Sequence, residues 1–324
     1  MVANDVTASR SQVTAEGYLH ELGVYGSDEQ FKELIVPFVT GGMDAGEPVV
    51  FAYDAHKTGL LQQWLPAVPA ITYVTDTSPY ATPAKALVAW RKVVESHLWA
   101  GARRVRIAGN VPHPGYSRSY VGWDRYESAL DVALGDLPVW APCLYDTRIT
   151  PPDVLDTAVK RHQRVLGRDG AHLPNAYFVP GRKLAEFLAP PSDPLESTRP
   201  ALELAGPTPA EARAAVSRAT EGLVDTDERQ DLVLATSEVV TNADRHGSLP
   251  LTMRMWTGER RVVVHVHDAG GGPGDPLAGL VPVEEGAQSG RGLWLIHQLD
   301  LDVALLPRPD GFTVRLRAGT PSEA

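Results

Sequence analysis

The stretch ATSEVVTNADRHG, residues 235–247, decides the fold of the C-terminal part of this chain. On a helix, Glu238, Asn242 and Arg245 follow one another at i, i+4 and i+7, so their polar side chains share one face. Small and apolar residues fall on a neighbouring face, roughly 100° round the helix axis. A helix that buries one face and presents a polar face beside it is typical of the wall of a cleft. Our working hypothesis is that this polar face points at the phosphates of a bound nucleotide.

The segment HDAGGGPG, residues 267–274, supplies another polar group in a glycine-rich setting. Asp268 closes an expected strand, so its carboxylate is placed to accept a hydrogen bond from the amino group of a base. Gly270 and Gly272 carry no side chain, which allows a ring to approach the backbone. The pattern therefore predicts that Asp268 binds the base of a nucleotide.

A third motif, SGRGLWLI at residues 289–296, leads from glycines into a helix expected at 293–299. The bare amides of Gly290 and Gly292, the positive end of the helix dipole and the Arg291 guanidinium can all meet phosphates. Taken singly, each motif is also compatible with a turn or a solvated helix face. Their occurrence together, in this order, favours a nucleotide pocket.

The C-terminal region, residues 200–318, has the pattern of an α+β domain with an antiparallel-rich sheet covered on one side by helices. Its expected strands are 201–204, 251–256, 261–267, 302–306 and 313–317, and its expected helices are 209–222, the helix that contains 235–247, and 293–299. A proline-rich linker at 189–199 separates this domain from an N-terminal domain at 13–188.

The N-terminal domain alternates strands and helices, which predicts an α/β fold with a mainly parallel sheet. The expected strands are 48–53, 71–74, 104–108 and 139–145, and the expected helices are 28–39, 57–65, 83–99 and 120–134. Residues 18–26 receive no assignment. Ligands of such sheets bind beyond the carboxyl ends of the strands, here at 54–56, 75–79, 109–116 and 145–148.

Two kinds of site are argued against in the N-terminal domain. Residues 41–47 (GGMDAGE) have the glycines of a phosphate loop, but Glu47 and Pro48 replace its lysine and hydroxyl residue, so a turn is predicted. The side chains that could bind a metal or haem share no ligand spacing, so no metal site is predicted from them. They are His20, Tyr25, His113, Cys143 and His162.

Composition narrows the class of protein further. The chain has 324 residues and a formal net charge of −10, which argues against direct nucleic-acid binding and favours proteins or small molecules as partners. One cysteine excludes an intrachain disulfide framework and suits a reducing compartment. No apolar run reaches the length of a membrane span, so we expect a cytoplasmic protein without membrane association.

A set of residues spread over the N-terminal domain carries a resemblance to a known family: His20, Glu21, Tyr25, 27–29 (SDE), 36–38 (VPF), Gly42, 46–48 (GEP), Trp123, Tyr126, Glu127 and 143–147 (CLYDT). With these residues the N-terminal domain resembles the MEDS sensory domain of bacterial regulators. The resemblance implies a RecA-like sheet and the sensing of an unknown small molecule, with hydrocarbon-type ligands proposed for the family.

The C-terminal domain resembles the Bergerat (GHKL) ATP-binding fold, and within it the anti-sigma-factor serine kinases. Residues 237–243 with 245–247 match the N box of that family, residues 268–272 its G1 box and residues 290–293 its G2 box. The resemblance implies ATP and Mg²⁺ as cofactors, with Asn242 binding the metal and Glu238 as general base. It further implies that Asp268 recognises adenine with Thr313 beside it, and that Gly270, Gly272, Gly290 and Gly292 shape the pocket and its lid.

Three features depart from the family pattern. Asp244 stands where a bulky apolar residue is usual, and is expected to affect packing or partner contact more than catalysis. Residues 273–289 are short for an ATP lid and rich in glycine and acid, so we expect them to become ordered with ATP. His162 lacks the acidic residue that follows a phosphoacceptor histidine, which argues against autophosphorylation.

The sequence leaves three functions open. The first is a Mg-ATP-dependent serine/threonine kinase that acts on a protein antagonist under control of the sensory domain. The second is nucleotide-controlled sequestration of a partner without significant catalysis, and the third is a sensor histidine kinase. The resemblance implies a sigma factor, an anti-anti-sigma (STAS-type) protein, or both as partners, and a possible homodimer.

Overall fold

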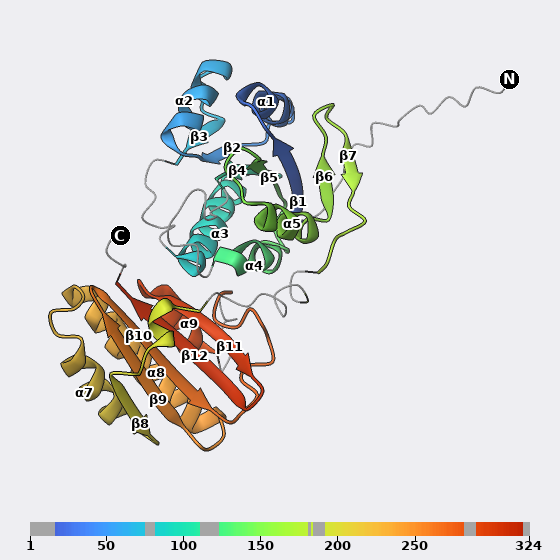
Figure 1. Ribbon diagram of the computed structural model, residues 1–324. Helices are drawn as coiled ribbons and strands as arrows, with labels where there is room; N and C mark the ends of the chain where they lie inside the picture. The colour runs from blue at the N-terminus through green and yellow to red at the C-terminus, as the bar shows by residue number, and fades with distance from the viewer. Residues whose placement is uncertain are drawn as a thin grey trace.

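The computed structural model describes residues 17–74, 82–110, 123–180, 183, 192–281 and 290–319. These residues form two sheets, each with its own helices, and each sheet belongs to one half of the chain (Figure 1). Among the described residues, no helix is both long and apolar enough to cross a membrane.

The N-terminal domain contains a seven-stranded sheet with the strand order β3-β2-β4-β5-β1-β6-β7. Its strands are β1 (Leu19–Tyr25), β2 (Val49–Ala52), β3 (Ile71–Tyr73), β4 (Val105–Gly109), β5 (Val139–Asp146), β6 (Arg164–Leu166) and β7 (His172–Pro174). Its helices are α1 (Asp28–Asp44), α2 (Ala55–Trp64), α3 (Pro83–Trp99), the short η2 (Trp123–Arg125), α4 (Tyr126–Ala133) and α5 (Pro152–Arg161). The strands pair in parallel except for β6 with β7, so the predicted α/β fold with a mainly parallel sheet is confirmed.

Helices cover both faces of this sheet. The apolar residues of α1 and α2 pack on one face with β2 and β5, whereas those of α3 and α4 pack on the other face with β4 and β5. Each fully buried aliphatic or aromatic side chain contributes about 1.5–3 kcal/mol of transfer free energy. The sheet is therefore held as the central layer between two helical layers.

At the start of this domain, the sequence missed one strand and ended one helix too early. Strand β1, to which the sequence assigned nothing, lies inside the sheet between β5 and β6. Helix α1, predicted over 28–39 with its end at Gly41 and Gly42, continues to Asp44. A Cβ on Gly42 would lie 2.8 Å from Cδ of Arg106, so this glycine makes room for the Arg106 side chain rather than ending the helix.

Polar residues gather at the carboxyl edge of the parallel strands, as the topology predicts. Lys57 Nζ donates to Asn110 Oδ1 at 2.9 Å, and Asn110 Nδ2 donates to Asp54 Oδ2 at 2.9 Å. Arg148 bonds both to Asp146 and to Asp28 at 2.6–3.1 Å. The other expected segments, 75–79 and most of 109–116, lie outside the described residues.

The C-terminal domain contains a five-stranded antiparallel sheet with the order β11-β12-β10-β9-β8. Its strands are β8 (Leu202–Ala205), β9 (Thr252–Gly258), β10 (Arg261–Asp268), β11 (Asp302–Arg308) and β12 (Gly311–Ala318). Its helices are α7 (Pro209–Ala219), α8 (Thr226–His246) and α9 (Arg291–Gln298). The predicted α+β domain is confirmed, and α8 packs its buried side chains, including Leu232 and Val239, against the sheet.

The described part of the linker, residues 192–199, lies on the other face of this sheet. The short η3 helix (Pro194–Ser197) follows Asp193, whose carboxylate bonds to Arg261 and Arg317. Glu196 accepts a 2.9 Å hydrogen bond from the buried Arg315. These charged contacts tie the end of the linker to the domain that follows it.

The two domains meet through helices α3 and α9 and through residues 275–281, which follow the glycine-rich segment 267–274. Leu277 and Leu280 are 1% and 4% exposed and belong to the same apolar core as α3 and α4. Arg125 donates to the carbonyl oxygen of Pro276 at 3.2 Å, and Thr82, the residue before α3, donates to the carbonyl oxygen of His297 in α9 at 3.3 Å. The two domains therefore share one stretch of core.

Candidate functional site

A cleft of about 330 Å³ opens between α8, the sheet and α9 in the C-terminal domain. It is lined by Val239, Asn242, Ala243, His246, Gly247, Val266, Asp268, Gly272, Pro273, Ala278, Gly290, Gly292, Leu293, Phe312 and Val314. Pockets for small molecules typically have volumes of about 300–1,000 Å³ and combine an apolar wall with a few polar groups. This cleft fits that description.

Helix α8 provides the first polar wall. Its start is fixed by Asp225, whose side chain accepts from the amide of Glu228 at 2.8 Å in a capping box. A Cβ on Gly292 of α9 would lie 3.0 Å from Asn242 Nδ2 and 3.4 Å from Glu238 Oε2. The side chains of Glu238 and Asn242 thus reach the first turn of α9 from the helix opposite.

Asp268, at the end of β10, provides a second polar group and is 8% exposed. Its Oδ1 accepts hydrogen bonds from the amide of Ser248 at 3.1 Å and from the amide of Gly270 at 2.7 Å. Among the described residues, no donor is bonded to Oδ2. Two backbone donors therefore hold the carboxylate in place and leave Oδ2 available to accept from a ligand.

Gly272 shapes the floor of the cleft. Its φ is +68°, a backbone conformation that residues with a side chain rarely adopt. A Cβ at this position would lie 2.2 Å from Cδ2 of Phe312. Both the conformation and the space therefore require glycine.

The N-terminus of α9 closes the cleft. Gly290 occupies the N-cap position and offers no side chain to cap the helix. The first amides of an α-helix have no partner within the helix, and they carry the positive end of its dipole. Arg291, the first residue of α9, is exposed. This end of α9 has the properties of an anion site facing Glu238 and Asn242.

The structure brings most of the expected residues together, but not all. Asn242, Asp268, Gly272, Gly290 and Gly292 line the cleft directly, whereas Glu238, Gly270 and Arg291 lie next to it. Arg245 is exposed and does not line the cleft, and the exposed Asp244 does not enter the core.

Thr313 is the exception among the expected contacts. Its hydroxyl is 2.9 Å from Nδ1 of His267, with which it pairs across β10 and β12. Asp268 pairs with Phe312 in the same register, and side chains alternate between the two faces of a strand. Thr313 therefore faces away from the cleft, and the expectation that its side chain lies beside Asp268 is wrong.

The sequence did not identify the apolar part of the cleft. Phe312, Val266 and Val314 lie on the same face of the sheet as Asp268. The period of two along a strand was the available signal, because Val266 precedes Asp268 by two residues. The contribution of Phe312 and Val314 required the pairing register of β10 with β12, which the sequence does not provide.

A smaller cavity of about 50 Å³ lies in the N-terminal domain, between its sheet and helices α3 and α4. Its lining is mostly apolar and includes Trp90, Leu130 and Leu134, together with Glu127 and Cys143. The first three residues belong to the same core as Leu277 and Leu280. Residues 277–280 therefore contact the core around this cavity through Leu277 and Leu280, and line the cleft through Ala278.

Comparisons with known proteins match one family model in each half of the chain. Residues 19–163 match the family model described as the methanogen/methylotroph, DcmR sensory domain (MEDS), and residues 206–318 match that of the histidine kinase-like ATPase domain. The chain therefore contains a MEDS sensory domain followed by a histidine kinase-like ATPase domain, a family to which the anti-sigma regulatory kinases belong. This combination is that of a regulatory signalling protein.

Among solved structures, the chain is similar to the NMR structure of the histidine kinase domain of the E. coli osmosensor EnvZ. The two are 16% identical, and the similarity covers 40% of this chain and 94% of that chain. The TM-score is 0.25, too low to support a conclusion about fold or function. No curated protein matches the chain.

Proposed function

We propose that the C-terminal domain is a Mg-ATP-dependent serine/threonine protein kinase whose activity is controlled by the N-terminal sensory domain. The observation that carries this proposal is the convergence of Glu238, Asn242 and the N-terminus of α9 on one side of the cleft, with Asp268 on another. A kinase needs an anion site, a metal ligand and a proton acceptor close together, and a separate site for the base.

The residues present fit ATP and Mg²⁺. Oδ2 of Asp268 is available for the amino group of adenine, and the apolar side chains of Val266 and Phe312 offer contacts for its ring. The open amides of α9, with Arg291, would hold phosphate oxygens. The amide oxygen of Asn242 is a hard ligand suited to Mg²⁺. Bound ATP would supply the phosphoryl group and Mg²⁺ would neutralise part of its charge.

Glu238 is the residue proposed to accept the proton of the attacking hydroxyl. Its carboxylate lies beside Asn242 at the first turn of α9, where the transferred group would be held. A carboxylate that removes this proton as the new bond forms acts as a general base. We assign no catalytic or binding role to Arg245, because its side chain is exposed and does not line the cleft.

The shared core supports regulation of this site by the sensory domain. Leu277 and Leu280 come from the segment between the two glycine clusters of the cleft, and Ala278 in the same segment lines the cleft. Trp90 on α3 lines the sensory cavity and packs in the same core as these leucines. A ligand that moves α3 would therefore change the position of α9 and of this segment, and with it the affinity for ATP.

The resemblance to the anti-sigma-factor serine kinases supports a proposal for the protein substrate. We propose an anti-anti-sigma (STAS-type) protein as the phosphate acceptor and a sigma factor as the partner released or retained by it. Autophosphorylation on His162 is not favoured, since this residue is fully buried in the N-terminal domain.

The test is phosphate transfer from radiolabelled ATP to purified STAS-type proteins, with wild type compared with Glu238→Gln. We expect acid-stable labelling of serine or threonine by the wild type, and its loss in the variant while ATP binding is retained. Asp227→Asn, a change of an exposed carboxylate in the first turn of the same helix, is the matched control and should label normally. ATP binding with no transfer by any variant would instead favour nucleotide-controlled sequestration of the partner.

A further inference from the structure

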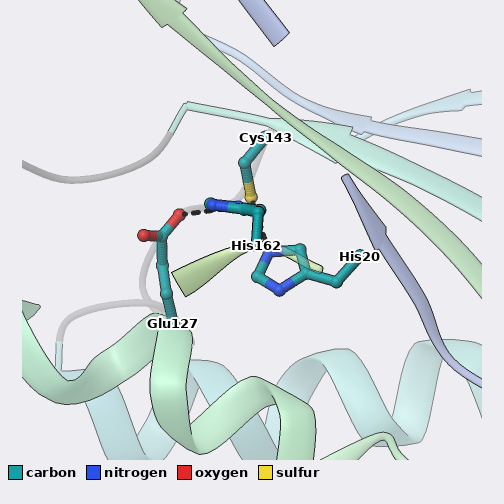
Figure 2. A group of neighbouring side chains, drawn as sticks. All are labelled: His20, Glu127, Cys143 and His162. Atoms are coloured by element: carbon teal, nitrogen blue, oxygen red, sulfur yellow. Dashed lines mark hydrogen bonds and ion pairs between the residues drawn. The ribbon is translucent and has the colours of Figure 1, made fainter. Parts of the chain in front are cut away.

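Four side chains that can bind a metal ion converge inside the N-terminal domain: His20, Glu127, Cys143 and His162 (Figure 2). They come from β1, α4, β5 and the residue that follows α5. Each offers one ligand atom, and these four atoms all lie within 4.8 Å of one another. All four residues are buried, with exposed fractions between 0% and 8%.

Two of the ligand atoms lack the hydrogen bonds that buried polar atoms normally have. Nε2 of His162 and Oε1 of Glu127 are buried without a hydrogen-bond partner among the described residues, and they lie 3.7 Å apart. A buried polar atom left without a partner costs about 1–3 kcal/mol. An ion bound between these atoms would satisfy both.

Both histidines are held in the orientation of a metal ligand. Nδ1 of His20 is 3.1 Å from Oδ1 of Asp131, and Nδ1 of His162 is 2.7 Å from the carbonyl oxygen of Ala158. When Nδ1 donates to such an acceptor, the lone pair of Nε2 is directed at the ligand. Nε2 of His20 lies 3.0 Å from Sγ of Cys143, so both Nε2 atoms point into the cluster.

We propose that these four residues form a binding site for a divalent transition-metal ion, with Zn²⁺ as the ion that the ligand set suits best. One thiolate, two imidazoles and one carboxylate are ligands that Zn²⁺ accepts in four-coordinate sites. The thiolate and the carboxylates of Glu127 and Asp131 carry three negative charges, which balance a divalent ion together with the buried Arg161, whose guanidinium donates to Glu127 at 3.3 Å. Binding releases the thiol proton of Cys143 to solvent.

The position of the site connects it to the cavity of the sensory domain. Glu127 and Cys143 belong to the four-residue cluster and also line the cavity of about 50 Å³. A bound ion would fix these two side chains and hence one wall of the cavity. This proposal is independent of the kinase assignment, because it concerns only the N-terminal domain.

The experiment uses the tag-free full-length chain, freed of metal with a chelator and titrated with Co²⁺ as a spectroscopic probe. We expect a thiolate-to-cobalt charge-transfer band that saturates at one equivalent and is displaced by Zn²⁺. Zn²⁺ alone should raise the thermal unfolding midpoint, whereas Mg²⁺ should not. A folded wild type that gives no charge-transfer band and no stabilisation by Zn²⁺ would overturn the proposal.

Variants assign the ligands. Cys143→Ser should abolish the charge-transfer band, and Asp131→Asn, a change at a positioning residue, should weaken Zn²⁺ binding by about 10–100-fold. His56→Asn, a change at an exposed histidine of the same domain, is the control and should bind normally. An unchanged spectrum in Cys143→Ser would contradict the site. Should that variant not fold, the charge-transfer band of the wild type, which only the single cysteine can produce, decides the question.

Discussion

The two domains differ in how their polar residues are brought together. In the C-terminal cleft, Glu238 and Asn242 come from one helix, and the other polar groups come from two short glycine-rich segments. In the N-terminal cluster, four single residues come from four places between His20 and His162. The residues of the first site occur in short local motifs of the sequence. Those of the second site are far apart in the sequence, and the parallel strands and their helices place them side by side.

This difference explains what the sequence predicted and what it missed. Helical spacing was enough to put Glu238 and Asn242 on one face, and the glycines marked the ends of β10 and the start of α9. The prediction that no metal site exists among His20, Cys143 and His162 relied on ligand spacing along the chain. Spacing is informative for a site within one hairpin or helix, but not for a site assembled by the order of strands in a sheet.

The remaining errors have other causes. Strand β1 was missed, although it lies inside the sheet, because its glycine and charged residues hide the apolar run. Most helices and strands agree with the predicted ranges to within a few residues, because capping residues and prolines mark their ends. Thr313 was assigned to the cleft because a motif gives the order of residues but not the face of the strand.

The N-terminal and C-terminal domains share one stretch of apolar core. A substitution that removes a side chain from this core should lower the stability of the protein more than any other change proposed below. Leu277→Ala should lower the free energy of unfolding by about 2–5 kcal/mol, because this leucine is 1% exposed. Leu249→Ala in the same domain is the control, since Leu249 is 84% exposed and its truncation should change stability by less than about 0.5 kcal/mol. Calorimetry measures both. Equal and small losses of stability in the two variants would mean that Leu277 is not buried against the N-terminal domain.

The cleft itself is tested by Gly272→Ala against Gly271→Ala. Alanine at 272 meets the ring of Phe312 and a left-handed backbone, so we expect ATP affinity to fall by at least about 10-fold, equivalent to roughly 1.4 kcal/mol. A Cβ at Gly271 meets nothing within 4 Å, so this variant should bind normally. Binding curves from isothermal titration distinguish the two. Normal ATP binding by Gly272→Ala would show that ATP does not bind in this cleft.

His297 of α9 is expected to make the stability of the protein depend on pH. Burial, with a smaller contribution from the nearby Arg125 cation, lowers the pKa of His297 to about 4. The folded state therefore keeps this histidine neutral while the unfolded state binds a proton below about pH 6.5, so stability is full above that pH and falls as the pH drops towards 4. The loss reaches no more than about 3 kcal/mol.

The variant His297→Gln lacks this titration. We expect the stability of the wild type relative to the variant to decline between pH 6.5 and pH 4, as measured by urea unfolding at a series of pH values. A difference that stays constant over this range would show that His297 titrates normally and that α9 is not buried against the N-terminal domain.

The smallest effect is expected at the rim of the domain contact. Lys85 of α3 forms an ion pair with Asp300, and the two side chains are 28% and 63% exposed. Exposed pairs contribute about 0–1 kcal/mol, so Lys85→Glu should lower stability by less than about 1 kcal/mol, with an effect that disappears at high salt. Thermal unfolding at low and high ionic strength measures this. A large effect that salt does not reduce would contradict the exposed position of the pair.

A titration of the full-length protein with ATP and Mg²⁺ tests whether Asp268 anchors an adenine nucleotide in the cleft of the C-terminal domain. We expect saturable binding by the wild type and an affinity about 10–100-fold lower for Asp268→Asn, since the new amide presents a donor where an acceptor is needed. Asp244→Asn, on the exposed side of α8, should bind like the wild type. A folded wild type that does not bind ATP, or an Asp268→Asn variant that binds it equally well, would contradict the account.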